Sequence, residues 1–87
     1  TWWCLVIKVL FFGQLKDQLQ ADVVEVQSDA PQTVSELLVN IIEERPDWAH
    51  DLSNEQLLVA VDQVMAKSDT LVPVAAEVAF FPPVTGG

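Results

Sequence analysis

Hydrophobic and polar positions alternate near the start of the chain. Residues 5–12 (LVIKVLFF) are mostly β-branched or aromatic, and this pattern predicts a buried strand. Its two faces carry alternate residues: Ile7, Val9 and Phe11 on one, and Lys8, Leu10 and Phe12 on the other. Because a lysine is rarely buried without a partner, we expect the Lys8 face to point outward. Phe12 is then an exposed aromatic residue, unless a helix or a loop covers it.

The next segment predicts the second arm of a hairpin. Residues 14–20 are polar apart from two leucines four positions apart, which favours a short helical turn or a loop. Residues 22–27 (DVVEVQ) predict a strand in which Val24 and Val26 point inward. The two strands would pair through the connection at residues 13–21.

One helix is clearly marked. Thr33 and Glu36 have the spacing of a capping box, in which each residue's side chain bonds the backbone N–H of the other. The helix that follows spans about residues 34–45, and Pro46 ends it. Its apolar positions fall on a single stripe: Val34, Leu37, Leu38, Ile41 and Ile42.

Residues 47–55 show no clear period and are expected to be irregular. We expect Trp48 and Leu52 to tuck beneath the main core. We expect His50 to lie in a surface loop without a catalytic role.

Three further strands are predicted in the last third. Residues 56–61 form one, residues 63–66 form a short return strand, and residues 77–81 form the last. The faces of the last strand separate by type: Val78 and Phe80 on one, and Glu77, Ala79 and Phe81 on the other. The charge of Glu77 places its face outside, so Phe81 is a second candidate for an exposed aromatic residue.

The order of these elements predicts an α+β fold. Two strands, one long helix and three more strands favour a mixed sheet with the helix packed across it. This is the β-grasp, or ubiquitin-like, arrangement, with a domain at residues 1–81 and an extended, flexible tail at residues 82–87. Its first and last strands lie side by side, so Phe12 and Phe81 should be neighbours with Met65 nearby. We expect these three residues to form a partner-docking patch.

Composition narrows the classes of function. The chain has 87 residues, is 51% apolar and carries a net charge of −9, so it is one small globular domain. Nucleic acids and anionic membranes would be repelled, whereas a basic protein surface would be attracted. The longest apolar run, residues 2–12, is interrupted by Lys8, is too short to span a bilayer, and lacks the features of a signal peptide.

Cysteine and histidine counts limit the chemistry further. The single cysteine, Cys4, cannot form an internal disulfide, which suits a reducing cytoplasm. With one histidine and no paired Cys or His spacing, no metal site is expected.

The chain ends in six residues without a charged side chain: Pro82, Pro83, Val84, Thr85, Gly86 and Gly87. The prolines leave the sheet and favour an extended chain, which would reach roughly 20 Å at ~3.3 Å per residue. Glycines have no Cβ and can thread a narrow channel. The reactive group would be the terminal carboxylate, which becomes an electrophile once it is adenylated. A sulfur nucleophile would then give a thiocarboxylate on Gly87, and a lysine would give an isopeptide.

The chain is not expected to catalyse that activation. It has three glycines, of which two are Gly86 and Gly87, and it has no phosphate-binding loop. It also has no plausible Ser/His/Asp or Cys/His constellation. We therefore expect a carrier whose active site belongs to another protein.

The sequence resembles the small subunit of molybdopterin synthase, a family of ubiquitin-like sulfur carriers. Three segments carry the resemblance: Glu77–Gly87 (EVAFFPPVTGG), Ile7–Phe12 (IKVLFF) and Leu57–Gln63 (LLVAVDQ). It extends over about residues 6–87, with the capping-box helix in the position of the family's long helix.

The resemblance implies a mechanism and partners. An activating enzyme related to ubiquitin E1 would adenylate Gly87, and a sulfur donor would convert it to a thiocarboxylate. AMP and sulfur would be held only transiently, with no permanent cofactor. The tail would enter the large synthase subunit, where the thiocarboxylate would sulfurate a cyclic pyranopterin phosphate to build the dithiolene of molybdenum cofactor biosynthesis. Two small and two large subunits would assemble, and Phe12, Met65 and Phe81 would dock.

Three alternatives stay open. A thiamine-pathway sulfur carrier would share the fold and the Gly-Gly end, but generally lacks the Phe-Phe-Pro-Pro segment. A ubiquitin-like protein modifier would form isopeptides with lysines, and a plain β-grasp binding module would have an inert tail. The chain departs from the synthase family at Leu71–Ala76, where the family usually has a polar Gly/Asp turn, and this leaves the turn geometry open.

Overall fold

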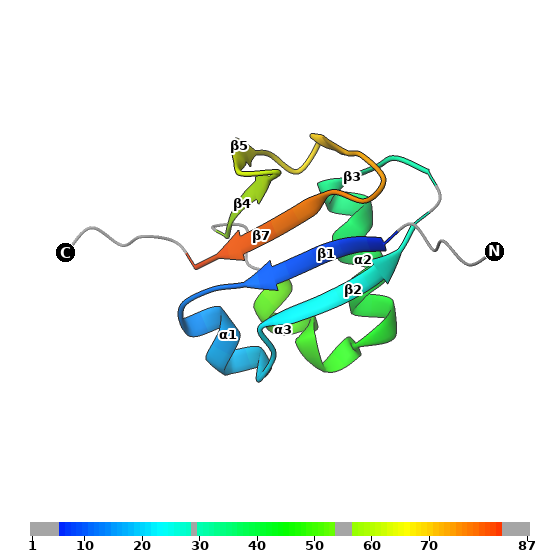
Figure 1. Cartoon of the computed structure of the whole chain (residues 1–87). Helices are drawn as coiled ribbons and strands as arrows, with labels where there is room; N and C mark the ends of the chain where they lie inside the picture. The colour runs from blue at the N-terminus through cyan, green and yellow to red at the C-terminus, as the bar shows by residue number, and fades with distance from the viewer. Residues whose placement is uncertain (1–5, 29, 54–56, 83–87) are drawn as a thin grey trace.

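A five-stranded mixed sheet forms the body of the molecule (Figure 1). The computed structural model describes residues 6–28, 30–53 and 57–82. The strand order is β2-β1-β7-β4-β5. The strand bounds are β1 (Val6–Phe11), β2 (Val23–Gln27), β4 (Leu58–Val61), β5 (Val64–Ala66) and β7 (Glu77–Phe81). β1 and β7 are parallel neighbours, while the other pairs are antiparallel. This places the first and last long strands side by side, as the sequence predicts.

The core lies between one face of the sheet and the helices α1 (Gln14–Leu19) and α2 (Val34–Glu44). The inward strand positions are fully or almost fully buried: Ile7, Val9, Phe11, Val59, Val61, Val78 and Phe80. The ring of Phe11 packs edge-on against Trp48 at 5.5 Å and stacks with Phe80 at 6.2 Å. The alternation in the first and last strands therefore identified the buried face correctly.

The capping box at the start of α2 is present. The Thr33 N–H donates to Glu36 Oε1 at 2.8 Å, and the Glu36 N–H donates to Thr33 Oγ1 at 3.1 Å. Val34, Leu37 and Ile41 are buried, and the other two stripe residues are half-buried. Arg45 leaves the helical conformation directly before Pro46, so the helix ends where a proline requires it to end.

The prediction of irregular structure at residues 47–55 is wrong for the part that the structure describes. A 3₁₀ helix, η1 (Pro46–Trp48), leads directly into α3 (Ala49–Leu52). Pro46 begins the first of these turns, where its missing N–H has no cost. Trp48 and Leu52 are four positions apart and both are buried, which explains the helical turn. His50 is exposed, as expected, but it lies in α3 and not in a loop.

A second, two-stranded sheet pairs β3 (Gln32–Thr33) with β6 (Leu71–Val72) and was not predicted. Two-residue strands are too short to show a period, so the pattern could not mark them. Backbone bonds extend this contact, because the Val34 N–H donates to the Thr70 carbonyl at 3.0 Å. The start of α2 is thereby tied to the segment that precedes β7.

The turn before β7 is built without glycine. Ala75 takes a left-handed conformation with φ 64, and the Ala76 N–H donates to the Pro73 carbonyl at 3.3 Å. Val72 and Ala76 are buried on either side of the turn. The unusual segment therefore still closes the turn and delivers Glu77 to the start of β7.

Candidate docking surface and C-terminal tail

The sheet face opposite the helices is the candidate docking surface. Residues that alternate with the core positions point to this face, and those on neighbouring strands meet in rows. We call its apolar part the outer patch, which consists of Leu10, Phe12, Val23, Leu58, Ala60, Met65, Ala79 and Phe81. The patch spans all five strands of the sheet.

Phe12 and Phe81 form the aromatic row of the outer patch. Their rings stack with centroids 5.3 Å apart and planes 13° apart. The Phe12 N–H donates to the Phe80 carbonyl at 3.1 Å, which holds the two rings in register. Phe12 is 43% exposed, so the alternative of a covered residue does not hold. Phe81 is half-buried, and one face of its ring lies against Phe12.

Met65 lies on the same face but in a different row. It pairs with Ala60 on β4, and Ala60 pairs with Ala79 on β7. Met65 is 61% exposed and is therefore accessible to a partner. Leu58, beside Phe81 in the register, lies diagonally between Met65 and the aromatic pair. Leu58 was not predicted, because residues 57–61 are all apolar and their pattern does not separate the two faces of the strand.

The other end of this face is charged. Lys8 on β1 lies opposite Glu25 on β2 and Glu77 on β7. Glu77 is fixed at its backbone, because its N–H donates to Asp62 Oδ1 at 2.9 Å. The outer face therefore changes along the strands from a charged row to an aromatic row. The aromatic row is the one where β7 ends.

Pro82 follows Phe81 directly and forms the root of the tail. It packs against Gly13, where an added Cβ would come within 3.1 Å of Pro82 Cγ. Gly13 has a φ of +63°, a backbone conformation that residues with a Cβ rarely adopt. Gly13 therefore lets the loop after β1 pass close to the tail root. The predictions for Pro83, Val84, Thr85, Gly86 and Gly87 concern positions outside the described residues and stay predictions.

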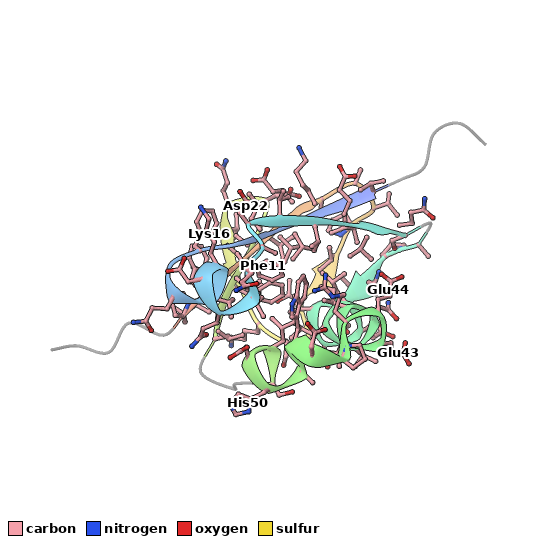
Figure 2. The ribbon with its side chains drawn as sticks, turned by 90° about the horizontal axis from the view of Figure 1, so that it is seen from below. Phe11, Lys16, Asp22, Glu43, Glu44 and His50 are labelled. Carbon is pink, nitrogen blue, oxygen red and sulfur yellow. The ribbon has the colours of Figure 1, made fainter. Side chains whose placement is uncertain are left out.

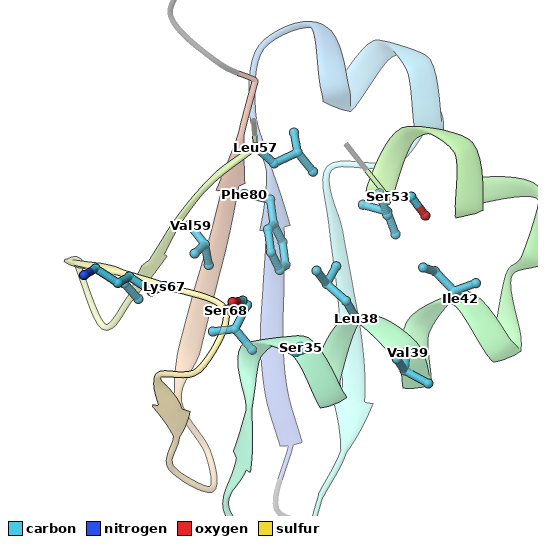
Figure 3. A pocket seen from close by; sticks show the side chains of 13 residues that line it. Ser35, Leu38, Val39, Ile42, Ser53, Leu57, Val59, Lys67, Ser68 and Phe80 are labelled. Carbon is cyan, nitrogen blue, oxygen red and sulfur yellow. The ribbon is translucent and has the colours of Figure 1, made fainter. Parts of the chain in front are cut away.

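A separate groove of about 690 Å³ lies on the helix side, between α2 and the β4–β5 hairpin (Figure 3). Its walls are mainly apolar and include Leu38, Ile42 and Phe80, with Lys67 at the edge. None of its lining residues belongs to the outer patch. Within the described part of the chain, no group of three His, Cys, Asp or Glu side chains is placed to hold a metal ion.

The sequence and the fold of this chain match known proteins. The family model described as the ThiS family matches residues 9–87. The chain belongs to the ThiS family. The chain is also 43% identical to the "Molybdopterin synthase sulfur carrier subunit" of Escherichia coli (strain K12), over 94% of this chain and 100% of the relative. The Haemophilus influenzae protein of the same name is 33% identical over the same shares.

Solved structures confirm the ubiquitin-like fold of this ThiS-family chain. SAMP1 from Haloferax volcanii matches with a TM-score of 0.77 at 23% identity, over 94% of this chain and 99% of that one. A chain from the Helicobacter pylori complex of subunits 1 and 2 of molybdopterin-converting factor matches with a TM-score of 0.63 at 20% identity, over 94% and 99%. In the residues that the structure describes, none of the helices is both long and apolar enough to cross a membrane.

Proposed function

We propose that this chain is the sulfur carrier subunit of a molybdopterin synthase. The observation that carries the proposal is the 43% identity to a relative of that name over the relative's entire length. The aromatic row beside Pro82 supports it, because a partner bound there would receive the tail directly. The chain would not catalyse the reaction alone, since the proposed active site lies on the large subunit.

The proposed chemistry takes place at Gly87 in three steps. The carboxylate first attacks the α-phosphate of ATP, which releases pyrophosphate and leaves an acyl adenylate. Sulfur at the oxidation level of sulfide then attacks the acyl carbon, AMP leaves, and Gly87 becomes a thiocarboxylate. That sulfur finally attacks a carbon of the cyclic pyranopterin phosphate and displaces the oxygen bound there. Water then hydrolyses the acyl–sulfur bond, which leaves the sulfur on the pterin and returns Gly87 to a carboxylate. One product needs two carriers, because a dithiolene contains two sulfur atoms.

The partners follow from these steps. We propose an activating enzyme related to ubiquitin E1, a separate sulfur donor and a large synthase subunit, in an assembly of two small and two large subunits. Phe12, Met65 and Phe81 would contact the large subunit, and Gly86 would pass through its channel with Thr85, Val84 and Pro83. AMP and sulfur would be transient cargo. We place the reaction in the cytoplasm, where ATP is available for the adenylation.

Extending the tail tests this function. One alanine added after Gly87 moves the carboxylate, so the reconstituted reaction should lose essentially all pterin dithiolene product. The reaction would contain the Escherichia coli large subunit and activating enzyme, ATP, a sulfur donor and the cyclic pyranopterin phosphate. The same alanine added before Thr1 is the control and should leave product formation intact. The proposal would be contradicted if the C-terminally extended protein were fully active while a mass spectrum showed that its extra alanine was still present.

A further inference from the structure

The outer edge of β2 presents hydrogen-bonding groups away from the sheet. β2 is the terminal strand in the order of the sheet. Phe11 and Asp22 lie opposite each other, and the Phe11 N–H donates to the Asp22 carbonyl at 3.0 Å. Antiparallel pairs alternate, so Val24 and Val26 turn their backbone groups toward β1. The groups that turn away from β1 belong to Val23, Glu25 and Gln27.

Grooves flank this edge on both faces of the sheet. The groove on the outer face, of about 750 Å³, includes Leu10, Phe12, Lys16 and Val23 in its walls. The groove on the helix side, of about 650 Å³, is lined by Glu25, Val26, Gln27, Asn40, Glu43 and Glu44. Figure 2 labels the two α2 carboxylates of that second groove. A strand added to β2 would direct alternate side chains into the two grooves.

We propose that the edge of β2 is a docking site for an extended, basic segment of a protein partner, which adds to the sheet as a sixth strand. Main-chain bonds to Val23, Glu25 and Gln27 would hold the segment along about 17 Å, at ~3.4 Å per residue. Glu43 and Glu44 form the acidic wall on the helix side, and they would receive lysine or arginine side chains from the segment.

Charge decides between this occupant and a second copy of the chain. Two copies joined antiparallel about Glu25 would place one Glu25 directly opposite the other, and like charges in that position are destabilising. Each copy also carries a net charge of −9. A basic segment avoids the contact between two Glu25 side chains, and the net negative charge of the chain attracts it. The opposite edge is a weaker candidate, because β5 has three residues whereas β2 has five.

Docking at the β2 edge is independent of sulfur transfer, and a binding experiment tests it. The full chain, labelled with ¹⁵N, would be titrated with an eight-residue peptide of alternating lysine and threonine. We expect saturable shifts of the Val23, Glu25 and Gln27 amide signals that weaken as salt is added. A peptide N-methylated at every residue cannot donate main-chain hydrogen bonds. Its affinity should be about tenfold lower, which is the loss expected from one or two hydrogen bonds of ~1 kcal/mol. A peptide with glutamate in place of lysine should behave likewise.

Substitutions of Glu25 separate the contribution of its backbone N–H to peptide binding from the contribution of its charge. Glu25→Pro removes an N–H that points away from β1, so binding should be lost while the β1 ladder is kept. Glu25→Gln keeps that N–H and should weaken binding only in part. Val64→Ser lies on β5, at the opposite edge of the sheet, and should leave the titration unchanged.

Three results would overturn the proposal. One is a set of peptide-induced shifts confined to Phe12, Met65 and Phe81. Another is equal binding of the N-methylated peptide to the unaltered protein, which decides the matter even if Glu25→Pro fails to fold. The third is self-association of the peptide-free protein through β2, seen as slower diffusion at higher concentration together with shifts of the same β2 amides, because the occupant would then be a second copy.

Discussion

Phe81 joins the outer patch to the tail root at Pro82. Its ring stacks on Phe12, its backbone ends β7, and Pro82 follows it. A glutamate at this position would place an unpaired charge in an apolar contact. We expect Phe81→Glu to weaken binding to the large synthase subunit by ~2 kcal/mol or more, about thirtyfold, as for a central interface residue. Isothermal titration calorimetry with the Escherichia coli large subunit would measure this change.

A matched charge elsewhere provides the control for Phe81→Glu. Val64 is also exposed but is paired with Val61, a position on the core side of β4. Val64→Glu therefore adds the same charge outside the outer patch, and it should leave the affinity close to that of the unaltered protein. Equal losses in the two variants would show that net charge alone sets the binding and would remove Phe81 from the interface.

Ala75 is a residue whose backbone conformation suits glycine. Its φ of 64 places a Cβ in the left-handed region, which costs roughly 1–2 kcal/mol. Ala75→Gly should raise the free energy of unfolding by ~0.5–1 kcal/mol, after the greater entropy of glycine in the unfolded chain is deducted. Urea denaturation would measure the change. Ala76→Gly is the control, since Ala76 is buried, and it should be destabilising. A loss of stability for Ala75→Gly would contradict the strain argument.

Single charged residues were the best guides to the outer face. Lys8 and Glu77 fixed which face of β1 and of β7 points outward, and the exposure of Phe12 confirms that reasoning. Leu58 was missed because residues 57–61 are apolar throughout, so no charge distinguishes the two faces of β4. The role of Phe12, Met65 and Phe81 in docking stays a prediction.

At the scale of elements, α2 depends on its N-terminal cap. Thr33→Ala removes the hydroxyl that accepts from the Glu36 N–H and should lower the free energy of unfolding by ~1 kcal/mol. Ser35→Ala, two residues further along the chain, is the control. It should not lower the free energy of unfolding, because Ser35 is exposed and alanine favours a helix. Thermal unfolding of both variants would check this. A Thr33→Ala variant as stable as the unaltered protein would show that the β3–β6 contact alone holds the helix start.

Elements with a full period were predictable, and shorter ones were not. α2, β1, β2 and β7 extend far enough for their apolar positions to repeat or alternate, and β4 and β5 were predicted as a short apolar run with its return strand. The four-residue α3 and the two-residue strands β3 and β6 do not. Their formation depends on tertiary packing, as with Trp48 against Phe11, which no local pattern encodes. The same limit applies to the groove beside β2, whose walls come from different segments of the chain.

The whole molecule is polarised along its sheet. One end of the outer face carries Lys8 between two glutamates, and the other carries the aromatic pair. β1 and β7 run in the same direction, so the chain leaves the sheet at the aromatic end (Figure 1). A partner that covers the outer patch therefore lies next to the tail root. This arrangement suits a carrier that is held by its domain while its end reacts.

The central claim is that sulfur is carried on Gly87. The most direct test is a mass spectrum of the intact protein after incubation with ATP, the Escherichia coli activating enzyme and a sulfur donor. Fragmentation of the C-terminal peptide would locate any exchange of oxygen for sulfur, because oxidation of Met65 gives the same nominal shift. We predict a thiocarboxylate on Gly87. An unchanged Gly87, in a reaction that converts the Escherichia coli carrier present beside it, would contradict the account.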